Sequence, residues 1–252
     1  MSAAKHLYIV TGASRGLGAA LTRALLAPGN RVVCVARSRN PEMEAEATAS
    51  GVPVAWHLQD LSQPGAAAGW LASVLDAVDE APASVTLILN AGVVEPIGPI
   101  TQLHETTLVP HLLTNLATPM TMTGAFIEHT ARFDCPRKVL AISSGAARNP
   151  VQGWSAYCAG KAALDMFVRS INAEFGSLAA PRTLRAVALA PGVVDTGMQE
   201  TIRGADFADV ARFRDLKAND KLASPDDTAR RIVAYLARPD FGTTEIDDIR
   251  NY

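Results

Sequence analysis

The sequence predicts an α/β fold: a single domain over residues 1–252, built on a doubly wound parallel sheet of the Rossmann type with about seven strands and helices on both faces. Short apolar runs rich in β-branched residues recur along the chain, and helical patterns separate them. A glycine-rich turn closes the first run and opens the first helix. In such a sheet, ligands bind at the carboxyl ends of the strands.

The predicted strands are short and apolar, as buried parallel strands are. They are Leu7–Thr11, Arg31–Ala36, Val54–Leu58, Val85–Asn90, Val139–Ser143 and Leu184–Ala190, with a short last strand at Phe241–Ile246. The predicted helices are Gly16–Ala27, Glu42–Ser50, Pro64–Val78, Leu108–Ala131 and Ser155–Leu178. Pro110 and Pro119 predict a kink or a late start in the fourth helix, because proline removes a backbone donor.

Composition and charge favour a small-molecule ligand. The chain is 48% hydrophobic and 19% charged, as soluble globular proteins are. Its net charge is −2 with no block of like charges, which argues against nucleic-acid and membrane partners. The first residues lack the apolar core of a signal peptide, so we expect a cytoplasmic protein. Three widely spaced cysteines and five scattered histidines predict free thiols and no metal site.

The first turn has the spacing of a phosphate-binding loop. Glycines let the backbone approach a pyrophosphate, and the following helix N-terminus offers free N–H groups to the anion. A glycine-rich loop alone is a weak signal, but here a strand precedes the loop and a helix follows it. The expected contacts with a dinucleotide cofactor are Gly12, Ser14, Arg15, Gly16, Leu17 and Gly18.

The end of the second predicted strand indicates which nicotinamide dinucleotide binds. An acidic residue at this position favours a free 2′-hydroxyl, and an arginine favours a 2′-phosphate. The strand is followed by Arg37 and Ser38 with no acid, and Arg15 supplies a second cation. We therefore predict NADP(H). The alternative for Arg37 is a solvated surface charge.

Further motifs complete a pattern that resembles the short-chain dehydrogenase/reductase family over essentially the whole chain. They are Asp60-Leu61, Asn90-Ala91-Gly92, Asn115, Ser144, Tyr157-x-x-x-Lys161 and Pro191-Gly192. Within that family, three segments and Arg212-Phe213 resemble the sepiapterin-reductase-like branch, which includes bacterial benzil reductases. The segments are Ser143–Pro150, Gly153–Cys158 and Pro191–Gln199.

The resemblance implies catalysis by Asn115, Ser144, Tyr157 and Lys161. Tyr157 would give a proton to a carbonyl oxygen, and Lys161, one helical turn away on the same face, would lower the pKa of that phenol. Ser144 would hydrogen-bond the substrate oxygen, with Ser143 pointing away from it. Asn115 resembles the family asparagine that holds a water next to the lysine. A Tyr-x-x-x-Lys pair by itself would be common by chance.

The resemblance also implies the remaining cofactor contacts. Asp60 and Leu61 would lie beside the adenine, and Asn90, Ala91 and Gly92 along the adenosine. Tyr157 and Lys161 would reach the nicotinamide ribose. Around the carboxamide, the expected residues are Pro191, Gly192, Val194 and Thr196.

Residues 195–223 interrupt the strand and helix pattern after the sixth strand. A segment of that length inside a compact domain is more often functional than idle, so we expect a helical substrate lid. Trp154, Met198 and Phe213 are candidates for an apolar wall of the substrate site, together with Ser144 and Tyr157. Packing in the core is the alternative for each of the three apolar residues.

The expected function is NADPH-dependent reduction of a ketone or diketone, with benzil-like or sepiapterin-like substrates. A 3-oxoacyl-thioester reductase is the alternative within the same chemistry. A catalytically silent NADP(H)-sensing protein is the alternative from another class, and the intact Ser144, Tyr157 and Lys161 argue against it. The family also implies a homodimer or homotetramer formed through the long helices and the last strand.

Overall fold

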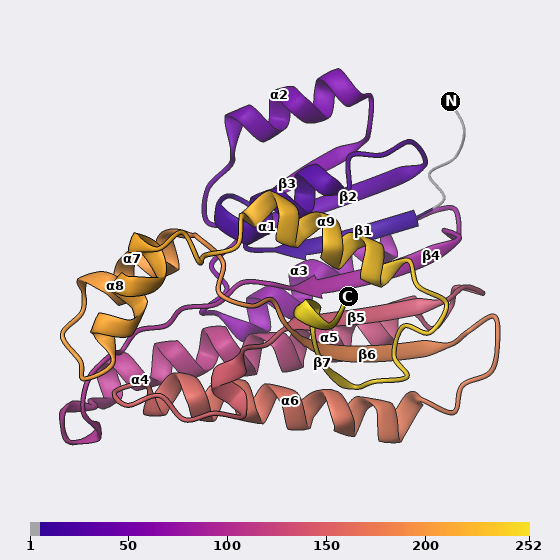
Figure 1. Cartoon of the computed structure of the whole chain (residues 1–252). Helices are drawn as coiled ribbons and strands as arrows, with labels where there is room; N and C mark the ends of the chain where they lie inside the picture. Colours follow the sequence, from indigo (N-terminus) through magenta and orange to yellow (C-terminus); the bar gives the residue numbers. More distant parts are fainter. Residues whose placement is uncertain (1–5) are drawn as a thin grey trace.

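Seven parallel strands form one sheet in the computed structural model, which describes residues 6–252 (Figure 1). The strands are β1 His6–Thr11, β2 Asn30–Ala36, β3 Val54–Leu58, β4 Ser84–Leu89, β5 Arg137–Ile142, β6 Leu184–Ala190 and β7 Ile246–Asp248. Their order is β3-β2-β1-β4-β5-β6-β7. The order reverses between β1 and β4, where a doubly wound sheet opens its ligand crevice. The predicted Rossmann-type fold is confirmed.

Helices cover both faces of the sheet (Figure 1). They are α1 Gly16–Ala24, α2 Pro41–Ser50, α3 Pro64–Asp76, α4 Glu105–Leu112, α5 Thr118–Thr130, α6 Ser155–Phe175, α7 Gly197–Gly204, α8 Val210–Ala218 and α9 Pro225–Leu236. One core cluster joins α3, α5 and α6 to one face, and a second joins α1 and α9 to the other. Within residues 6–252, no helix is long and apolar enough to cross a membrane.

The strands alternate between the two core clusters. In β1, Leu7 and Ile9 lie in the cluster under α3, α5 and α6, whereas Val10 lies in the cluster under α1 and α9. Successive side chains of a strand point to opposite faces. Because both faces are covered, the strands read as nearly continuous apolar runs, which is the pattern that predicted them.

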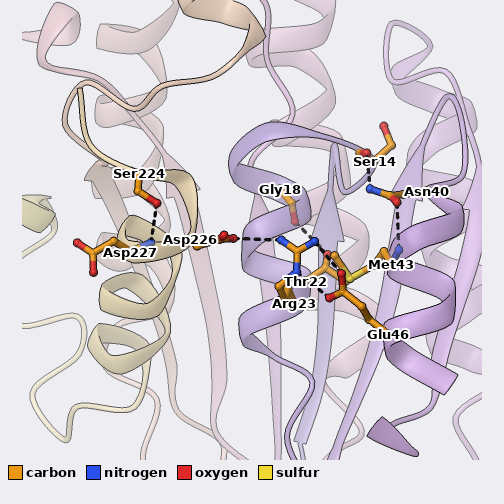
Figure 2. Close-up of polar contacts among 10 residues, drawn as sticks. All are labelled: Ser14, Gly18, Thr22, Arg23, Asn40, Met43, Glu46, Ser224, Asp226 and Asp227. Carbon is orange, nitrogen blue, oxygen red and sulfur yellow. Dashed lines mark hydrogen bonds and ion pairs between the residues drawn. The ribbon is translucent and has the colours of Figure 1, made fainter. Parts of the chain in front are cut away.

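Arg23 of α1 forms ion pairs with α2 and with α9 (Figure 2). Arg23 of α1 donates from Nε and Nη2 to the Glu46 carboxylate of α2 at 2.6 and 2.9 Å. The same guanidinium contacts Asp226 of α9 at 3.1 Å. These side chains are partly exposed, so the pairs stabilise the fold only modestly. They nevertheless fix the place of α2 against α1.

Two expected element boundaries are wrong. The fourth helix does not start late, since α4 begins at Glu105, but the π-helical turn Leu113–Ala117 interrupts it between Pro110 and Pro119 before α5 begins. The last strand is β7, after the expected Phe241–Ile246. Gly242 has φ +89° in a turn there, and Phe241 instead packs on Tyr235 of α9, with ring centroids 5.6 Å apart.

A substitution in the core between α5 and the sheet tests this packing. Phe126 is fully buried there. We expect Phe126→Ala to lower the free energy of unfolding by about 3–5 kcal/mol, because it leaves a cavity in a close-packed interior. The measurement is urea denaturation followed by circular dichroism. Glu128→Ala, at an exposed position of the same helix, is the control and should change stability by less than about 0.5 kcal/mol. Equal effects of the two variants would contradict the assignment of the core.

Candidate active site

The glycine turn between β1 and α1 has the geometry of a pyrophosphate cradle. Gly16 has φ +55°, a conformation that favours glycine. A Cβ on Gly18 would lie 2.1 Å from the Gly12 carbonyl oxygen and 2.5 Å from Asn90 Nδ2, so no side chain fits. Arg15, at the N-cap of α1, forms no side-chain cap, which leaves the first N–H groups of the helix for an anion. The turn therefore fits the phosphates of a dinucleotide.

A short hydrogen-bond network joins this turn to the end of β4. Thr11 Oγ1 accepts hydrogen bonds from the backbone N–H groups of Asn90 at 2.9 Å and Ala91 at 3.0 Å. Asn90 Nδ2 donates to the Thr11 carbonyl at 3.0 Å. The side chain of Asn90 thus braces the turn across the point where the strand order reverses. Thr11 was not among the predicted site residues, although it opens the glycine motif.

Two arginines lie in the turns that follow β1 and β2. Arg15 and Arg37 are exposed, and neither guanidinium forms a hydrogen bond or ion pair with any residue in 6–252. Arg39, by contrast, pairs with Glu44 at 3.0 Å. The Asp60 carboxyl lies near Arg37: a backbone hydrogen bond from Ser62 lowers its pKa most, and the charge of Arg37 lowers it further. Both predicted cations are therefore available for a phosphate.

The start of α6 and the end of β5 bring three predicted catalytic residues together. Tyr157 and Lys161 are buried, and Lys161 Nζ lies 5.8 Å from the centroid of the Tyr157 ring. Lys161 Nζ donates to the Ile142 carbonyl at 2.7 Å. Ser144 Oγ accepts the N–H of Ala146 at 3.1 Å, and Ser144 lies near enough to the Tyr157 hydroxyl to lower its pKa. Helical spacing predicted that Tyr157 and Lys161 share one face, because one helical turn separates them, and the family resemblance added Ser144.

Burial shifts the pKa values of this pair in opposite directions. It raises the pKa of the Tyr157 phenol to about 12, and the hydrogen bond from Ser144 opposes the rise. It lowers the pKa of the Lys161 ammonium to about 8, and the Asp165 carboxylate opposes the fall. The expected net lowering of the Tyr157 pKa is therefore not found, because burial of the phenol outweighs the interactions that favour its ionised form. By the pH at which the phenol would ionise, the lysine has already lost its charge.

Asn115 is buried in the π-helical turn, but its side chain is already occupied. Its Oδ1 accepts the N–H of Val93 at 2.9 Å, and its Nδ2 donates to the Val93 carbonyl at 2.7 Å. The same Nδ2 donates to His111 Nε2 at 3.0 Å, while His111 Nδ1 donates to the Glu95 carbonyl at 2.6 Å. Both N–H groups of the amide are therefore engaged, and the expected role of Asn115 in holding a water next to Lys161 stays a prediction.

Sequence reasoning missed two buried polar residues beside this group. His111 lies four residues before Asn115, and its pKa is lowered by burial, so its ring is neutral. Asp165 lies four residues after Lys161 and hydrogen-bonds the Ser143 hydroxyl. Ser143 thus points away from Ser144, as strand alternation predicts. Helical spacing from Asn115 and Lys161 was the available signal for both residues.

The segment after β6 returns to its own starting point beside the glycine turn. Val194 forms a parallel β-bridge with Ala223, and Asp195 N donates to the Ala223 carbonyl at 2.9 Å. A Cβ on Gly16 would lie 3.3 Å from Thr196 Cγ2, so Thr196 lies against the cradle. Figure 1 shows α7 and α8 beyond the carboxyl ends of the strands. The predicted helical character of residues 195–223 is confirmed.

The proposed substrate wall forms a small aromatic cluster between this segment and α6. Trp154 stacks on Phe213 with ring centroids 5.0 Å apart, and it meets the Tyr157 ring edge-on at 5.5 Å. Met198 packs against the same cluster. Phe207, which sequence reasoning did not select, completes the cluster at 5.9 Å from Trp154. Trp154 and Phe213 are both buried, as the core-packing alternative requires.

The comparisons with known proteins agree with this geometry. A sequence profile of the short-chain dehydrogenases matches residues 6–206. The chain belongs to the short-chain dehydrogenase/reductase family. The benzil reductase ((S)-benzoin forming) of Bacillus cereus is 35% identical over 242 residues, covering 94% of this chain and 96% of that protein. The sepiapterin reductase of Meriones unguiculatus is 33% identical over 252 residues, covering 92% of each. The predicted branch is confirmed.

A solved structure extends the comparison. A metagenomic short-chain oxidoreductase in complex with NADP is 27% identical, with a TM-score of 0.73, covering 98% of this chain and 96% of that one. The family uses nicotinamide cofactors and acts on alcohol or carbonyl groups. This chain is therefore an oxidoreductase of that class.

The opposite pKa shifts of Tyr157 and Lys161 can be measured directly. We expect Tyr157 to remain protonated as the pH passes 10.0, the ordinary pKa of a phenol. The measurement is the tyrosinate absorbance of the protein minus that of Tyr157→Phe during an alkaline titration. Lys161→Met is the control and should leave this difference unchanged, because the lysine is neutral above a pH of about 8. Ionisation of Tyr157 below pH 10.0 would contradict the dominance of burial.

Proposed function

We propose that the protein reduces a ketone or diketone to an alcohol with NADPH, and that its substrates resemble benzil or sepiapterin. The observation that carries this proposal is the grouping of Ser144 with the buried Tyr157 and Lys161 where β5 ends and α6 begins. The similarity to a benzil reductase and a sepiapterin reductase supports a carbonyl substrate.

The side chains of this group have complementary roles in the proposed reaction. Bound NADPH supplies hydride to the carbonyl carbon. Ser144 and Tyr157 donate hydrogen bonds to the oxygen on which negative charge develops. Tyr157 is a neutral acid at neutral pH, since burial keeps its pKa at about 12, and it gives its proton to that oxygen. Lys161, which is charged below a pH of about 8, stabilises the phenolate that is left.

NADP(H) is the proposed cofactor because the guanidinium groups of Arg15 and Arg37 have no partner within residues 6–252 and the turn between β2 and α2 contains no acid. The NADP complex of the metagenomic relative supports the same assignment. The other cofactor contacts implied by the resemblance are proposals as well. So is a positioning role for Asn115, whose amide ties the π-helical turn to the loop after β4.

Residues 195–223 are proposed to act as the substrate lid. Their two ends meet at the Val194–Ala223 bridge, and the helices between them cover the aromatic cluster. Opening of this segment would expose Trp154, Met198 and Phe213 to an aryl substrate, as an apolar wall requires.

NADPH oxidation with a panel of carbonyl compounds tests the proposal. We expect the highest kcat/KM with aryl diketones, compared with sepiapterin-like pterins, 3-oxoacyl thioesters and simple sugars. We also expect faster turnover with NADPH than with NADH. Preference for 3-oxoacyl thioesters would assign the alternative reductase. Inactivity on every compound would favour the silent NADP(H)-sensing protein.

Tyr157→Phe is the matched control because it removes only the hydroxyl. Turnover should fall by about 10²–10⁴-fold, the usual contribution of general acid catalysis. NADPH binding, followed by cofactor fluorescence, should be retained. Full activity of this variant would remove Tyr157 from the proposed role.

A homodimer or homotetramer is proposed through α5 and α6. Met120 of α5 and Met166 of α6 are 43% and 57% exposed, and the two helices share one face of the sheet. We expect light scattering to give at least twice the mass of the 26.6 kDa chain. Met120→Glu with Met166→Glu should reduce that mass to one chain. A wild-type monomer would contradict the proposal. The cytoplasmic location stays a prediction from the sequence.

A further inference from the structure

The two arginines proposed to bind the 2′-phosphate come from different turns. Arg15 ends the glycine turn that follows β1, and Arg37 begins the turn that joins β2 to α2. Neither guanidinium has a partner within residues 6–252 that would hold it in place. Their separation is therefore set by the backbones of the two turns. A phosphate held by two guanidinium groups needs both at hydrogen-bonding distance, about 2.7–2.9 Å.

One side chain spans the gap between these turns (Figure 2). Asn40 Nδ2 donates to the carbonyl oxygen of Ser14 at 3.0 Å. Ser14 directly precedes Arg15, and Asn40 lies three residues after Arg37. The bases of the two turns are already joined, because Gly12 N donates to the Val35 carbonyl at 2.8 Å. The Asn40–Ser14 hydrogen bond joins the two turns a second time, farther from the strands.

The asparagine is itself fixed by helix α2. Its Oδ1 accepts the N–H of Met43 at 3.0 Å, which caps the helix, and Met43 is fully buried. Six residues along the helix, Glu46 is paired with Arg23 of α1. Helix α2 is thus attached to the glycine-turn side of the fold at both places. Asn40 uses its acceptor for the helix and its donor for the glycine turn.

We propose that Asn40 is a specificity-determining positioning residue, whose amide holds the two turns at the separation at which Arg15 and Arg37 both bind the 2′-phosphate of NADP(H). This role rests on the proposed function. NADH carries a hydroxyl in place of that phosphate and makes no use of the two cations. Loss of the bridge should therefore weaken NADPH and spare NADH, whereas a purely structural defect would weaken both.

Asn40→Ser tests the hydrogen bond to Ser14 separately from the capping of α2. Serine caps helices about as well as asparagine, but it has no amide to donate to Ser14. The measurement is the Kd of NADPH and of NADH for the full-length chain, by cofactor fluorescence titration. We expect the Kd of NADPH to rise about tenfold with little change for NADH. Asn40→Thr is a second capping variant and should behave in the same way.

Ser224→Ala is the matched control. Ser224 caps α9 by accepting the N–H of Asp227 at 3.4 Å, and it contacts neither turn (Figure 2). This variant should lower Tm by a few degrees and leave the ratio of the two Kd values unchanged. A shift of the ratio in Ser224→Ala as large as in Asn40→Ser would overturn the role of the bridge.

A double-mutant cycle with Arg37→Ala tests whether Asn40 acts through the arginines. In the Arg37→Ala background, Asn40→Ser should have little further effect on the Kd of NADPH, because the cation that it positions is gone. Fully additive effects would overturn the proposal. The proposal would also be overturned if Asn40→Ser kept the same ratio of the Kd of NADPH to the Kd of NADH as the wild type. A wild type that binds NADH as tightly as NADPH would instead overturn the cofactor assignment, and the positioning role with it.

Discussion

The carboxyl ends of β1 and β4 are tied together by Thr11 and Asn90, and the candidate site depends on that junction. The strand order reverses there, so the chain leaves the sheet on opposite sides and opens a crevice. Asn90 also occupies the space that a side chain at position 18 would need. On the far side of the junction, a Cβ on Gly92 would lie 3.1 Å from Asn115 Oδ1 and 3.8 Å from Lys161 Nζ. The contact between Thr11 and Asn90 thus lies between the glycine turn on one side and Asn115 and Lys161 on the other.

Burial affects the protonation of Tyr157 and of Lys161 in opposite ways. It keeps the phenol protonated, which suits a proton donor, but it also weakens the charge of the ammonium. Two groups of the fold oppose that loss: the carbonyl of Ile142 accepts a hydrogen bond from Nζ, and Asp165 adds a negative charge one turn along α6. Both are held by the end of β5, since Asp165 also hydrogen-bonds Ser143. The strand that carries Ser144 therefore also supports the charge of Lys161.

The sequence was sufficient for the features that are local. Apolar runs predicted the strands, and spacing along one helix brought Tyr157 and Lys161 to one face. Features that depend on burial, or on contacts between residues far apart in the sequence, could not be predicted from local patterns. The raised pKa of Tyr157, the engagement of the Asn115 amide with Val93 and the bridge from Asn40 to Ser14 all require knowledge of what lies opposite each side chain. The last strand was misplaced because Phe241 looks like a strand residue yet packs beneath α9.

The bridge between Val194 and Ala223 joins the two ends of the segment after β6 at one point. The segment begins and ends at one point beyond the end of β6, so its length can change without moving the strands, while Thr196 keeps its start against Gly16 of the glycine turn. Loop closure becomes only slightly less favourable as a loop grows, by about 0.6 kcal/mol for each doubling of its length. Relatives can therefore diverge in what they accept while the reacting groups stay in place. The same point of attachment is where a segment from a relative could be grafted to test whether residues 195–223 determine what the protein accepts.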